Sequence, residues 1–365
     1  MSSEKRVLLA MSGGLDSSVA AIILKSQGWD IVGVTMKVFD YDILGMDAPE
    51  SGCCNLDSIN DARNIAVSLG FPHYVVDFRD PFEDIVINNF VDEYMSGRTP
   101  NPCVLCNTHI KWEALLEKAD ELDCKYIATG HYSQIRFEND RYVLSKGLDL
   151  WKDQSYMLWG LTQKSLSRTI FPLGEKTKDE IRQLAADSGF KKIANKRESY
   201  DICFVPDNNY RGFLQKKVHD IDEQIGAGDF VDVNGKVLGK HKGYPYYTIG
   251  QRKGLEIALG KPAYVKHIDA QNNRIVLAFQ EDIYSKRISL KNCNFMKFEK
   301  LPENYEALVK IRYRDKGMMA NLEQNGDKTI VNFHNPVSAV APGQSAVVYD
   351  GNDVVMGGFI DEIYE

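Results

Sequence analysis

The chain has 365 residues, of which 44% are hydrophobic and 26% charged, and its net charge at pH 7 is −7. This length predicts two or three domains of about 150 residues each. No apolar run approaches the ~20 residues that a membrane-spanning helix needs. A strand begins within a few residues of the N-terminus, which leaves no room for a signal peptide. We therefore expect a cytoplasmic globular protein.

Positive charge is confined to two segments of this acidic chain. Residues 141–200 hold 12 Lys and Arg against 7 Asp and Glu, and residues 236–266 hold 7 against 1. Such a distribution suits a protein that binds a polyanion such as a nucleic acid. Lysine-rich surfaces that face only solvent explain the charge equally well.

The chain has seven cysteines, an odd number. Neither the number nor the spacing is typical of a secreted disulfide framework. Reactive thiols or a metal site are the better interpretation.

Apolar strands alternate with amphipathic helices over the first 130 residues. The pattern predicts strands at 6–11, 31–38, 73–77 and 126–129 and helices at 17–27, 56–69 and 110–122. This alternation is typical of an α/β fold with a doubly wound parallel sheet. Ligands bind such sheets at the carboxyl ends of the strands, where residues 12–17, Met36, Gly130 and His131 are expected.

The pattern changes after Pro206. A helix is predicted at 178–188, but glycines are frequent beyond residue 206 and short strands replace the helices. Strands predicted at 306–313, 328–333 and 344–349 alternate in polarity, which favours a small antiparallel barrel. We predict a catalytic domain at 1–206, a small central domain at 207–274 and a C-terminal β-barrel at 275–365.

The segment Ser12-Gly-Gly-Leu-Asp-Ser17 joins the first strand to the first helix. Two glycines let the backbone approach a ligand, and the N–H groups at the start of the helix attract phosphate. The segment is not a Walker A loop, because no Lys-Ser/Thr pair follows the glycines. It resembles the pyrophosphate-binding loop of ATP pyrophosphatases, whereas a tight turn of the sheet is the structural alternative. Asp16 is expected to position metal or phosphate, or else to cap the helix.

Cysteines also occur in two short motifs. Thr99-Pro-Asn-Pro-Cys103-Val-Leu-Cys106-Asn107 contains two prolines, which predict an ordered loop rather than a helix. A Cys-x-x-Cys pair there fits a redox pair, cluster ligands or half of a zinc site, but no second pair completes a zinc site. Cys203 is predicted in another loop, where Lys196 and Arg197 upstream would favour its thiolate; a buried structural thiol is the alternative. We interpret Cys124 and Cys293 as structural, while Cys53 and Cys54 remain ambiguous.

Several motifs occur in one order along nearly the whole chain. They are the Ser12–Ser17 loop, Asn101-Pro-Cys-Val-Leu-Cys-Asn107, Ala128-Thr-Gly-His-Tyr132, Lys152-Asp-Gln-Ser-Tyr156, Asp201-Ile-Cys-Phe204, Thr248-Ile-Gly-Gln-Arg-Lys-Gly254, Ile311-Arg-Tyr-Arg314 and Ala341-Pro-Gly-Gln344. Together they resemble the tRNA-specific 2-thiouridylases. The resemblance implies a PP-loop (adenine nucleotide alpha hydrolase-like) catalytic domain.

The resemblance implies that ATP activates O2 of the wobble uridine, position 34 of the tRNA, as an adenylate. Pyrophosphate leaves in this step, with Mg²⁺ screening the phosphate charge, and AMP leaves when sulfur enters. The residues expected to bind ATP on this basis are Leu9, Ala10, Met11, Ser12, Gly13, Gly14, Leu15, Asp16, Ser17, Met36 and Gly130.

The resemblance also implies two catalytic cysteines. Cys203 would carry sulfur as a persulfide, received from a cysteine desulfurase or a sulfur-relay protein. Cys106 would attack the persulfide to release sulfide, leaving a Cys106–Cys203 disulfide for reductants to reopen. Well-known members have Asp where this chain has Cys103. Cys103, Cys106 and Cys203 could instead ligate a four-iron four-sulfur cluster that binds sulfide.

Further residues are expected to contact tRNA by resemblance. Arg312 and Arg314 are predicted to share one face of a strand, with Tyr313 between them, which suits an RNA backbone. A core role for His131, a solvated turn around Lys152 and a chance pattern in the barrel are the alternatives. The full expected set is Asn101, Pro102, Cys103, His131, Lys152, Asp153, Gln154, Arg312, Tyr313 and Gln344.

Two other functions are compatible with the loop between the first strand and the first helix. An amidotransferase-type adenylating synthetase uses ammonia and needs no paired loop cysteines, and an RNA-binding protein that uses ATP as a switch releases no pyrophosphate. Neither accounts for the cysteine motifs.

Overall fold

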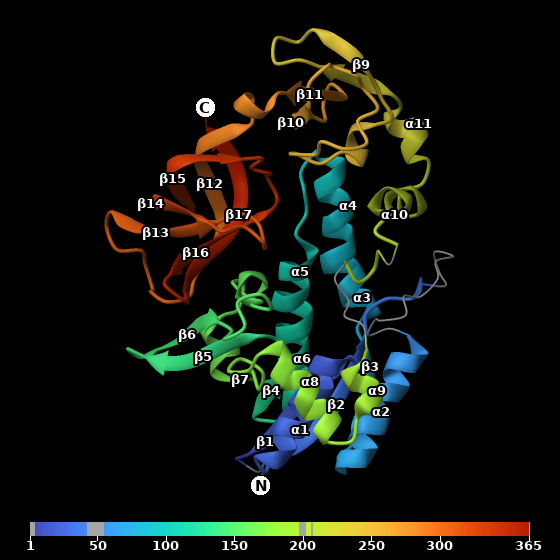
Figure 1. Cartoon of the computed structure of the whole chain (residues 1–365), viewed down its shortest axis with the longest axis vertical. Coiled ribbons are helices and arrows are strands. Elements are labelled where there is room, and N and C mark those ends of the chain that lie inside the picture. Colours follow the sequence, from blue (N-terminus) through green and yellow to red (C-terminus); the bar gives the residue numbers. More distant parts are fainter. Residues whose placement is uncertain (1–3, 42–54, 197–201, 206, 365) are drawn as a thin grey trace.

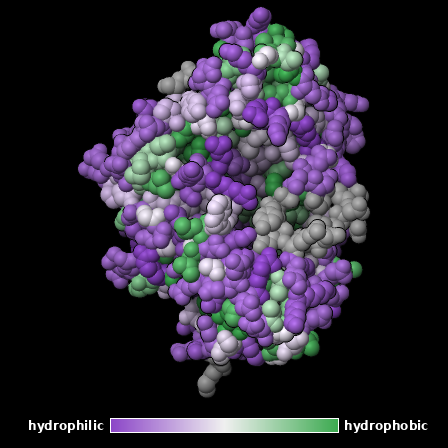
Figure 2. Space-filling view, in the orientation of Figure 1, coloured by the Kyte–Doolittle hydropathy of each residue, from purple (hydrophilic) through white to green (hydrophobic). Residues whose placement is uncertain are grey.

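A computed structural model describes residues 4–41, 55–196, 202–205 and 207–364. Figure 1 shows three parts: an α/β part at the N-terminal end, a central part at the opposite end, and a barrel beside the helices that connect them. The face in Figure 2 is mainly hydrophilic, with small separate hydrophobic areas. No helix in the described part of the chain is long and apolar enough to cross a membrane.

The N-terminal part is built on a five-stranded parallel sheet with the order β3-β2-β1-β4-β7. Its predicted strands are confirmed to within about a residue at each end. The strands are β1 (Arg6–Ala10), β2 (Asp30–Lys37), β3 (His73–Asp77), β4 (Tyr126–Ala128) and β7 (Thr169–Ile170).

Helices cover both faces of this sheet, so the doubly wound α/β fold is confirmed. Val7 and Leu9 of β1 pack in one cluster with α1 and α8, whereas Leu8 belongs to the cluster on the opposite face. Period-2 alternation thus buries both faces of one strand. The helices on the first face are α1 (Leu15–Ser26), α2 (Leu56–Leu69), α8 (Lys178–Asp187) and α9 (Lys191–Ala194).

A column of helices runs from the sheet towards the central part (Figure 1). The sequence missed its first half, and it predicted a loop where the second half begins. That loop prediction is wrong, because Pro102 occupies the first turn of a helix. A backbone N–H in this turn has no hydrogen-bond partner within the helix, so proline, which lacks the N–H, is tolerated there. The elements are α3 (Arg79–Phe82), the π-helix η2 (Glu83–Ile87), α4 (Asn88–Met95), α5 (Pro102–Leu105), the π-helix η3 (Cys106–Ala114) and α6 (Leu115–Glu121).

The central part holds a four-stranded sheet with the order β10-β11-β8-β9. The strand of this sheet that comes last along the chain ends at Ala278, whereas we predicted that the central domain ends at residue 274. The elements are α10 (Tyr210–Lys217), α11 (Ile221–Ile225), β8 (Gly228–Val231), β9 (Val237–His241), the 3-10 turn η5 (Tyr244–Tyr246), β10 (Tyr264–Asp269) and β11 (Arg274–Ala278).

The C-terminal part is a six-stranded antiparallel barrel, as predicted, closed by pairing of the first and last strands. One prediction there is wrong. Residues Arg312–Arg314 follow β13 as a turn, because Asp315 accepts backbone hydrogen bonds from Ile311 and Gly317 and ends the strand. After the 3-10 turn η6 (Gln280–Asp282), the strands are β12 (Tyr284–Phe295), β13 (Tyr305–Lys310), β14 (Met318–Asn325), β15 (Lys328–Ser338), β16 (Ser345–Asp350) and β17 (Asp353–Tyr364).

A hairpin from the N-terminal half joins the edge of this barrel. Its second strand pairs antiparallel with β17 of the barrel, where Ser145 lies opposite Asp353. The hairpin therefore fixes the barrel against the α/β part. It consists of β5 (Ser133–Glu138) and β6 (Arg141–Lys146), and the 3-10 turn η4 (Ser155–Met157) and α7 (Gln163–Ser167) follow it.

Candidate active site

The loop between β1 and α1 is shaped by two close approaches. Gly13 has φ +68°, and a Cβ there would lie 2.0 Å from the carbonyl oxygen of Ser58. A Cβ on Gly130 would lie 2.9 Å from the backbone of Asp16 and Ser17. Among the residues that the structure describes, no side chain caps the N-terminus of α1. The start of α1 therefore keeps N–H donors for an anion, as phosphate binding requires.

Asp16 neither caps the helix nor points into open solvent. Lys178 Nζ lies 2.7 and 3.0 Å from the two carboxylate oxygens of Asp16, and the hydroxyl of Tyr132 donates to Oδ1 at 2.8 Å. Lys178 begins α8 and is 8% exposed. Helix capping, the alternative role of Asp16, is therefore absent, and an ammonium group lies beside the loop between β1 and α1.

A second lysine reaches the loop from the other side. Lys196 Nζ donates to the Gly13 carbonyl oxygen at 3.0 Å and to Asp61 at 2.9 Å. Burial would raise the pKa of Asp61, but hydrogen bonds and charge from Lys196 and Lys192 outweigh it and lower that pKa. We predicted from the sequence that Lys196 favours the thiolate of Cys203, whereas in the structure its ammonium group binds Gly13 and Asp61. Arg197 lies outside the described residues.

The other expected ATP-binding residues lie around the carboxyl ends of β1 and β2. Most of their side chains are buried, so a nucleotide in this place would meet backbone groups. Thr35 donates to the Met11 carbonyl oxygen and so joins the two strand ends. Ser17 Oγ accepts a hydrogen bond from the Ser12 N–H and donates to the Gly14 carbonyl oxygen, which holds the loop closed. Leu9, Met11, Leu15 and Met36 are buried, and Ala10 is half-buried.

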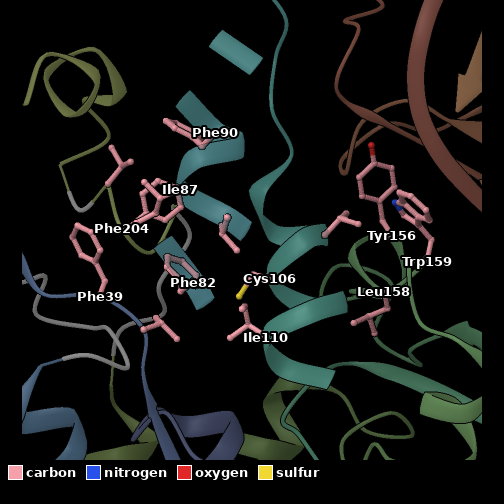
Figure 3. Close-up of a cluster of buried hydrophobic side chains, with 14 of the residues drawn as sticks. Phe39, Phe82, Ile87, Phe90, Cys106, Ile110, Tyr156, Leu158, Trp159 and Phe204 are labelled. Atoms are coloured by element: carbon pink, nitrogen blue, oxygen red, sulfur yellow. The ribbon is translucent and has the colours of Figure 1, made fainter. Parts of the chain in front are cut away.

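Cys106 lies at the start of η3 and is 8% exposed. Figure 3 shows its sulfur within an apolar cluster, on the side of the helix where Phe82 and Ile110 lie. Because a buried thiol is shielded from solutes, it reacts only with groups that the protein or a bound substrate brings into contact with it.

Cys203 lies in a turn and is exposed. Its neighbour Phe204 is 1% exposed and packs against Phe82 and Phe90, with ring centroids 5.7 and 5.1 Å apart. Tyr41 donates a hydrogen bond to the Cys203 carbonyl oxygen. Phe204 thus anchors the Cys203 turn in the same apolar cluster that contains Cys106 (Figure 3).

Cys103 and His131 share an electrostatic environment. Solvent reaches the Cys103 thiol, yet desolvation by the surrounding protein raises its pKa, and the positive charge of Lys111 partly opposes this. Desolvation and then Lys111 lower the pKa of His131 well below its usual value. The imidazole is therefore neutral at pH 7, with Nδ1 hydrogen-bonded to the Thr129 hydroxyl at 2.7 Å.

Cys103, Cys106 and Cys203, the alternative set of cluster ligands, do not come together as a metal-binding group in the described part of the chain. Among the described residues, which include Cys103, Cys106 and Cys203, no group of three or more His, Cys, Asp or Glu side chains could hold a metal ion. An iron–sulfur cluster needs thiolates that converge on it. This arrangement of cysteines therefore does not fit such a cluster. Cys53 and Cys54 lie outside the described residues.

Three of the expected tRNA contacts lie where the helix column meets the barrel. The Asn101 amide donates to Ser345 Oγ at 3.1 Å, and the Gln344 amide donates to the Pro100 carbonyl oxygen. Asn101 and Pro102 are buried. These side chains hold the two parts together, directly ahead of Cys103.

Two other expected tRNA segments also come together. Tyr313 lies within electrostatic range of Lys152 and Asp153, and its ring is 6.1 Å from that of Tyr156. Arg312 and Arg314 are exposed. Segments 160 positions apart therefore lie near one another, and each carries basic side chains.

Lys178, Tyr132 and Lys111 are the site residues that sequence reasoning missed. Tyr132 and Lys178 belong to sequence patterns that we interpreted differently. Tyr132 ends the Ala128–Tyr132 motif, and Lys178 starts a helix with a capping box. Their roles follow from tertiary contacts with Asp16. Lys111 had no signal beyond its place in a predicted helix.

Comparison with known proteins identifies the family of this chain. Residues 5–207 match the family described as tRNA methyl transferase HUP domain, residues 211–278 match the tRNA methyl transferase PRC-barrel domain, and residues 285–360 match the Aminomethyltransferase beta-barrel domain. The chain is 56% identical to the tRNA-specific 2-thiouridylase MnmA of Cytophaga hutchinsonii over the whole of both chains. It is 56% identical to that of Amoebophilus asiaticus, over 97% of this chain and 95% of the relative, and 52% identical to that of Salinibacter ruber, over 100% and 96%. The chain belongs to the tRNA-specific 2-thiouridylase family.

Proposed function

We propose that this protein is an ATP-dependent tRNA-uridine 2-sulfurtransferase that acts on the wobble uridine, position 34. The observation that carries the proposal is the pairing of two features in one α/β part: a phosphate-binding loop, and two cysteine segments tied to one apolar cluster. The first feature suits activation of an oxygen by ATP, and the second suits delivery of sulfur. The reaction is proposed to occur in the cytoplasm, with tRNA as substrate.

The loop and two lysines are assigned to ATP. Backbone N–H groups at the start of α1 would bind phosphate oxygens, with Lys178 and Lys196 adding positive charge on either side. Asp16 is the carboxylate of this loop that would share Mg²⁺ with the phosphates. A Mg²⁺ ion held there would neutralise phosphate charge as pyrophosphate leaves. Uridine O2 attacks the α-phosphorus, the bond to pyrophosphate breaks, and an O-adenylate forms.

The two cysteines are assigned to sulfur transfer. Cys203 is exposed, which suits a residue that receives sulfur from a cysteine desulfurase or relay protein. The Cys106 thiolate attacks Sγ of the Cys203 persulfide, so the S–S bond breaks, a Cys106–Cys203 disulfide forms and hydrosulfide leaves. Hydrosulfide attacks C2 of the adenylate and AMP departs with the C–O bonding pair. An external dithiol reopens the disulfide.

The remaining contacts are assigned to tRNA. Cys103 and neutral His131 lie next to the catalytic segments and would face the base, whereas Lys152, Arg312 and Tyr313 would meet the backbone. Asn101, Pro102, Asp153, Gln154 and Gln344 would act by holding these segments, because their side chains are buried or bonded within the protein.

Substitution of the two cysteines tests the proposal. Cys106→Ser and Cys203→Ser should each abolish 2-thiouridine formation, since serine can neither carry nor attack a persulfide sulfur. Incubation with an unmodified tRNA transcript, ATP, Mg²⁺ and a persulfide donor, followed by nucleoside mass spectrometry, measures this. Cys124→Ser is the matched control: Cys124 is 2% exposed, and burial raises its thiol pKa to about 11. Full thiolation by Cys203→Ser would contradict the assignment.

A further inference from the structure

The loop from Gly147 to Gln154 is held rigidly at the edge of the candidate site. The Leu148 N–H donates to the Gly174 carbonyl oxygen at 2.8 Å. The two carboxylate oxygens of Asp149 accept from the backbone N–H groups of Trp151 and Lys178, both at 3.0 Å. The side chains of this loop are therefore presented in a fixed arrangement.

The polar residues at the end of this loop point back into the protein. Asp153 is 7% exposed and accepts hydrogen bonds from the N–H groups of Gly147 and Ser155, at 3.2 and 3.1 Å. The side-chain oxygen Oε1 of Gln154 accepts a hydrogen bond from the Tyr132 N–H at 3.0 Å. Asp153 and Gln154 thus shape the loop, and its outward contacts must come from other residues.

The outward side of the loop is apolar. Trp151 is 94% exposed, and Leu150 and Leu148 are 68% and 57% exposed. In contrast, Trp112 and Trp159 are 0% and 3% exposed. Full exposure of an indole on a rigid loop leaves a large apolar surface in water, which indicates a surface that is covered by a ligand.

Basic residues lie next to this apolar surface in the sequence and on the turn that approaches it. Lys152 follows Trp151 directly and lies within electrostatic range of Tyr313. Arg312, Arg314 and Lys316 in the adjoining turn are exposed. An aromatic plane beside several cations is typical of sites for unpaired nucleotides, where bases stack and phosphates meet the charges. A protein interface would place fewer lysines around its apolar centre.

We propose that Trp151 is a tRNA-binding residue whose indole stacks on an unpaired base of the substrate, while Lys152 and Arg312 bind the adjoining phosphates. This inference rests on the proposed function, because it takes tRNA as the ligand. It moves the direct contact of the loop from Asp153 and Gln154 to Trp151. Since the base offers only its face, the contact adds affinity with little sequence preference.

Tryptophan substitutions separate stacking from burial of apolar area. Trp151→Ala and Trp151→Leu should each weaken binding of an unmodified tRNA transcript about tenfold, and Trp151→Phe should restore part of it, because only an aromatic ring stacks. KM for tRNA should rise with kcat unchanged. Quenching of tryptophan fluorescence on tRNA addition should be lost in Trp151→Ala. Phe137→Ala, which removes an aromatic side chain that is 61% exposed on the β5–β6 hairpin, should change none of these.

Salt dependence separates the aromatic from the charged contacts. Lys152→Ala should reduce the slope of log affinity against log salt by about 1, whereas Trp151→Ala should leave that slope unchanged. Equal tRNA affinity of Trp151→Ala and the unchanged protein overturns the stacking proposal alone. So does loss of self-association in Trp151→Ala with tRNA affinity intact, since the surface would then bind a second copy. Absence of tRNA binding by the unchanged protein overturns the proposed function as well.

Discussion

At the residue scale, Cys103 stands at the position where the resemblance to the family led us to expect Asp. Aspartate would be charged at neutral pH, whereas the raised pKa of Cys103 keeps its thiol protonated. The described residues gather no three ligands around a metal. In the proposed reaction we therefore assign Cys103 to a polar side chain next to the substrate, and the two sulfur-transfer roles to Cys106 and Cys203.

Cys103→Asp and Cys103→Ser should each retain thiolation, because neither removes a thiol that carries sulfur. Rates within about tenfold of the unchanged protein are expected, the size of one weak hydrogen bond or charge effect. Nucleoside mass spectrometry measures the product. Anaerobic iron–sulfur reconstitution is the control. An activity that requires the reconstituted cluster and vanishes in Cys103→Ser would instead establish Cys103 as a ligand.

At the scale of elements, the turn between β1 and α1 depends on close backbone packing. Ser58 in the first turn of α2 lies against Gly13, and Gly130 after β4 lies against the start of α1. Three segments from different strand–helix units thus fix the phosphate-binding loop. Such a loop tolerates no added atom on the packed side.

Gly13→Ala should abolish ATP-dependent pyrophosphate release, because its Cβ would lie 2.0 Å from a backbone oxygen and must displace the loop. Gly28→Ala is the matched control at the other end of α1. Gly28 has a similar φ of +76°, but no atom of the described residues lies within 4 Å of an added Cβ. It should cost about 1 kcal/mol of stability and leave pyrophosphate release unchanged. ATP titration measures pyrophosphate release by both variants, and thermal unfolding measures their stability. Unimpaired pyrophosphate release by Gly13→Ala would refute the prediction.

At the scale of the whole molecule, Asp353 joins the barrel to the β5–β6 hairpin. Arg136 donates to its two carboxylate oxygens at 2.7 and 2.8 Å, and Ser145 and Lys297 bind it as well. Burial would raise the pKa of Asp353, but these hydrogen bonds hold it well below its usual range. One carboxylate therefore connects segments more than 200 residues apart.

Asp353→Asn should destabilise the protein by about 3 kcal/mol at pH 7, since it leaves Arg136 and Lys297 without their shared anion. A lowered folded-state pKa means that the contribution is present above the unfolded pKa of about 3.9 and is lost as pH falls below it. The difference in unfolding temperature between the two proteins should therefore be constant from pH 7 to about pH 5 and shrink at lower pH. Asp350→Asn, at an exposed partner of Lys297, is the control. A difference that is equally large at the lowest pH would exclude this role of Asp353.

Local patterns predicted the parts of the fold that local physics controls. The strands of the parallel sheet and the end of α2 at Gly70, with φ +70°, follow from periodicity and from glycine's access to left-handed backbone. The helix beginning at Pro102 was missed because proline excludes a helix interior but not a first turn. The turn at Arg312 was missed because Asp315 ends β13 through its own side chain.

The sequence by itself determined the α/β class, the phosphate-binding loop and the two cysteine motifs, because each is carried by a few adjacent residues whose chemistry depends little on distant parts. Only the tertiary structure decided what surrounds them. Lys178 reaches Asp16 across 162 positions, and Lys152 lies near Tyr313 from the opposite half of the chain. Periodicity and motifs carry no information on such distances, since the pairs form only when separate elements pack together. The same packing decided that Asp153 is buried and Trp151 exposed, although the two residues are only two positions apart.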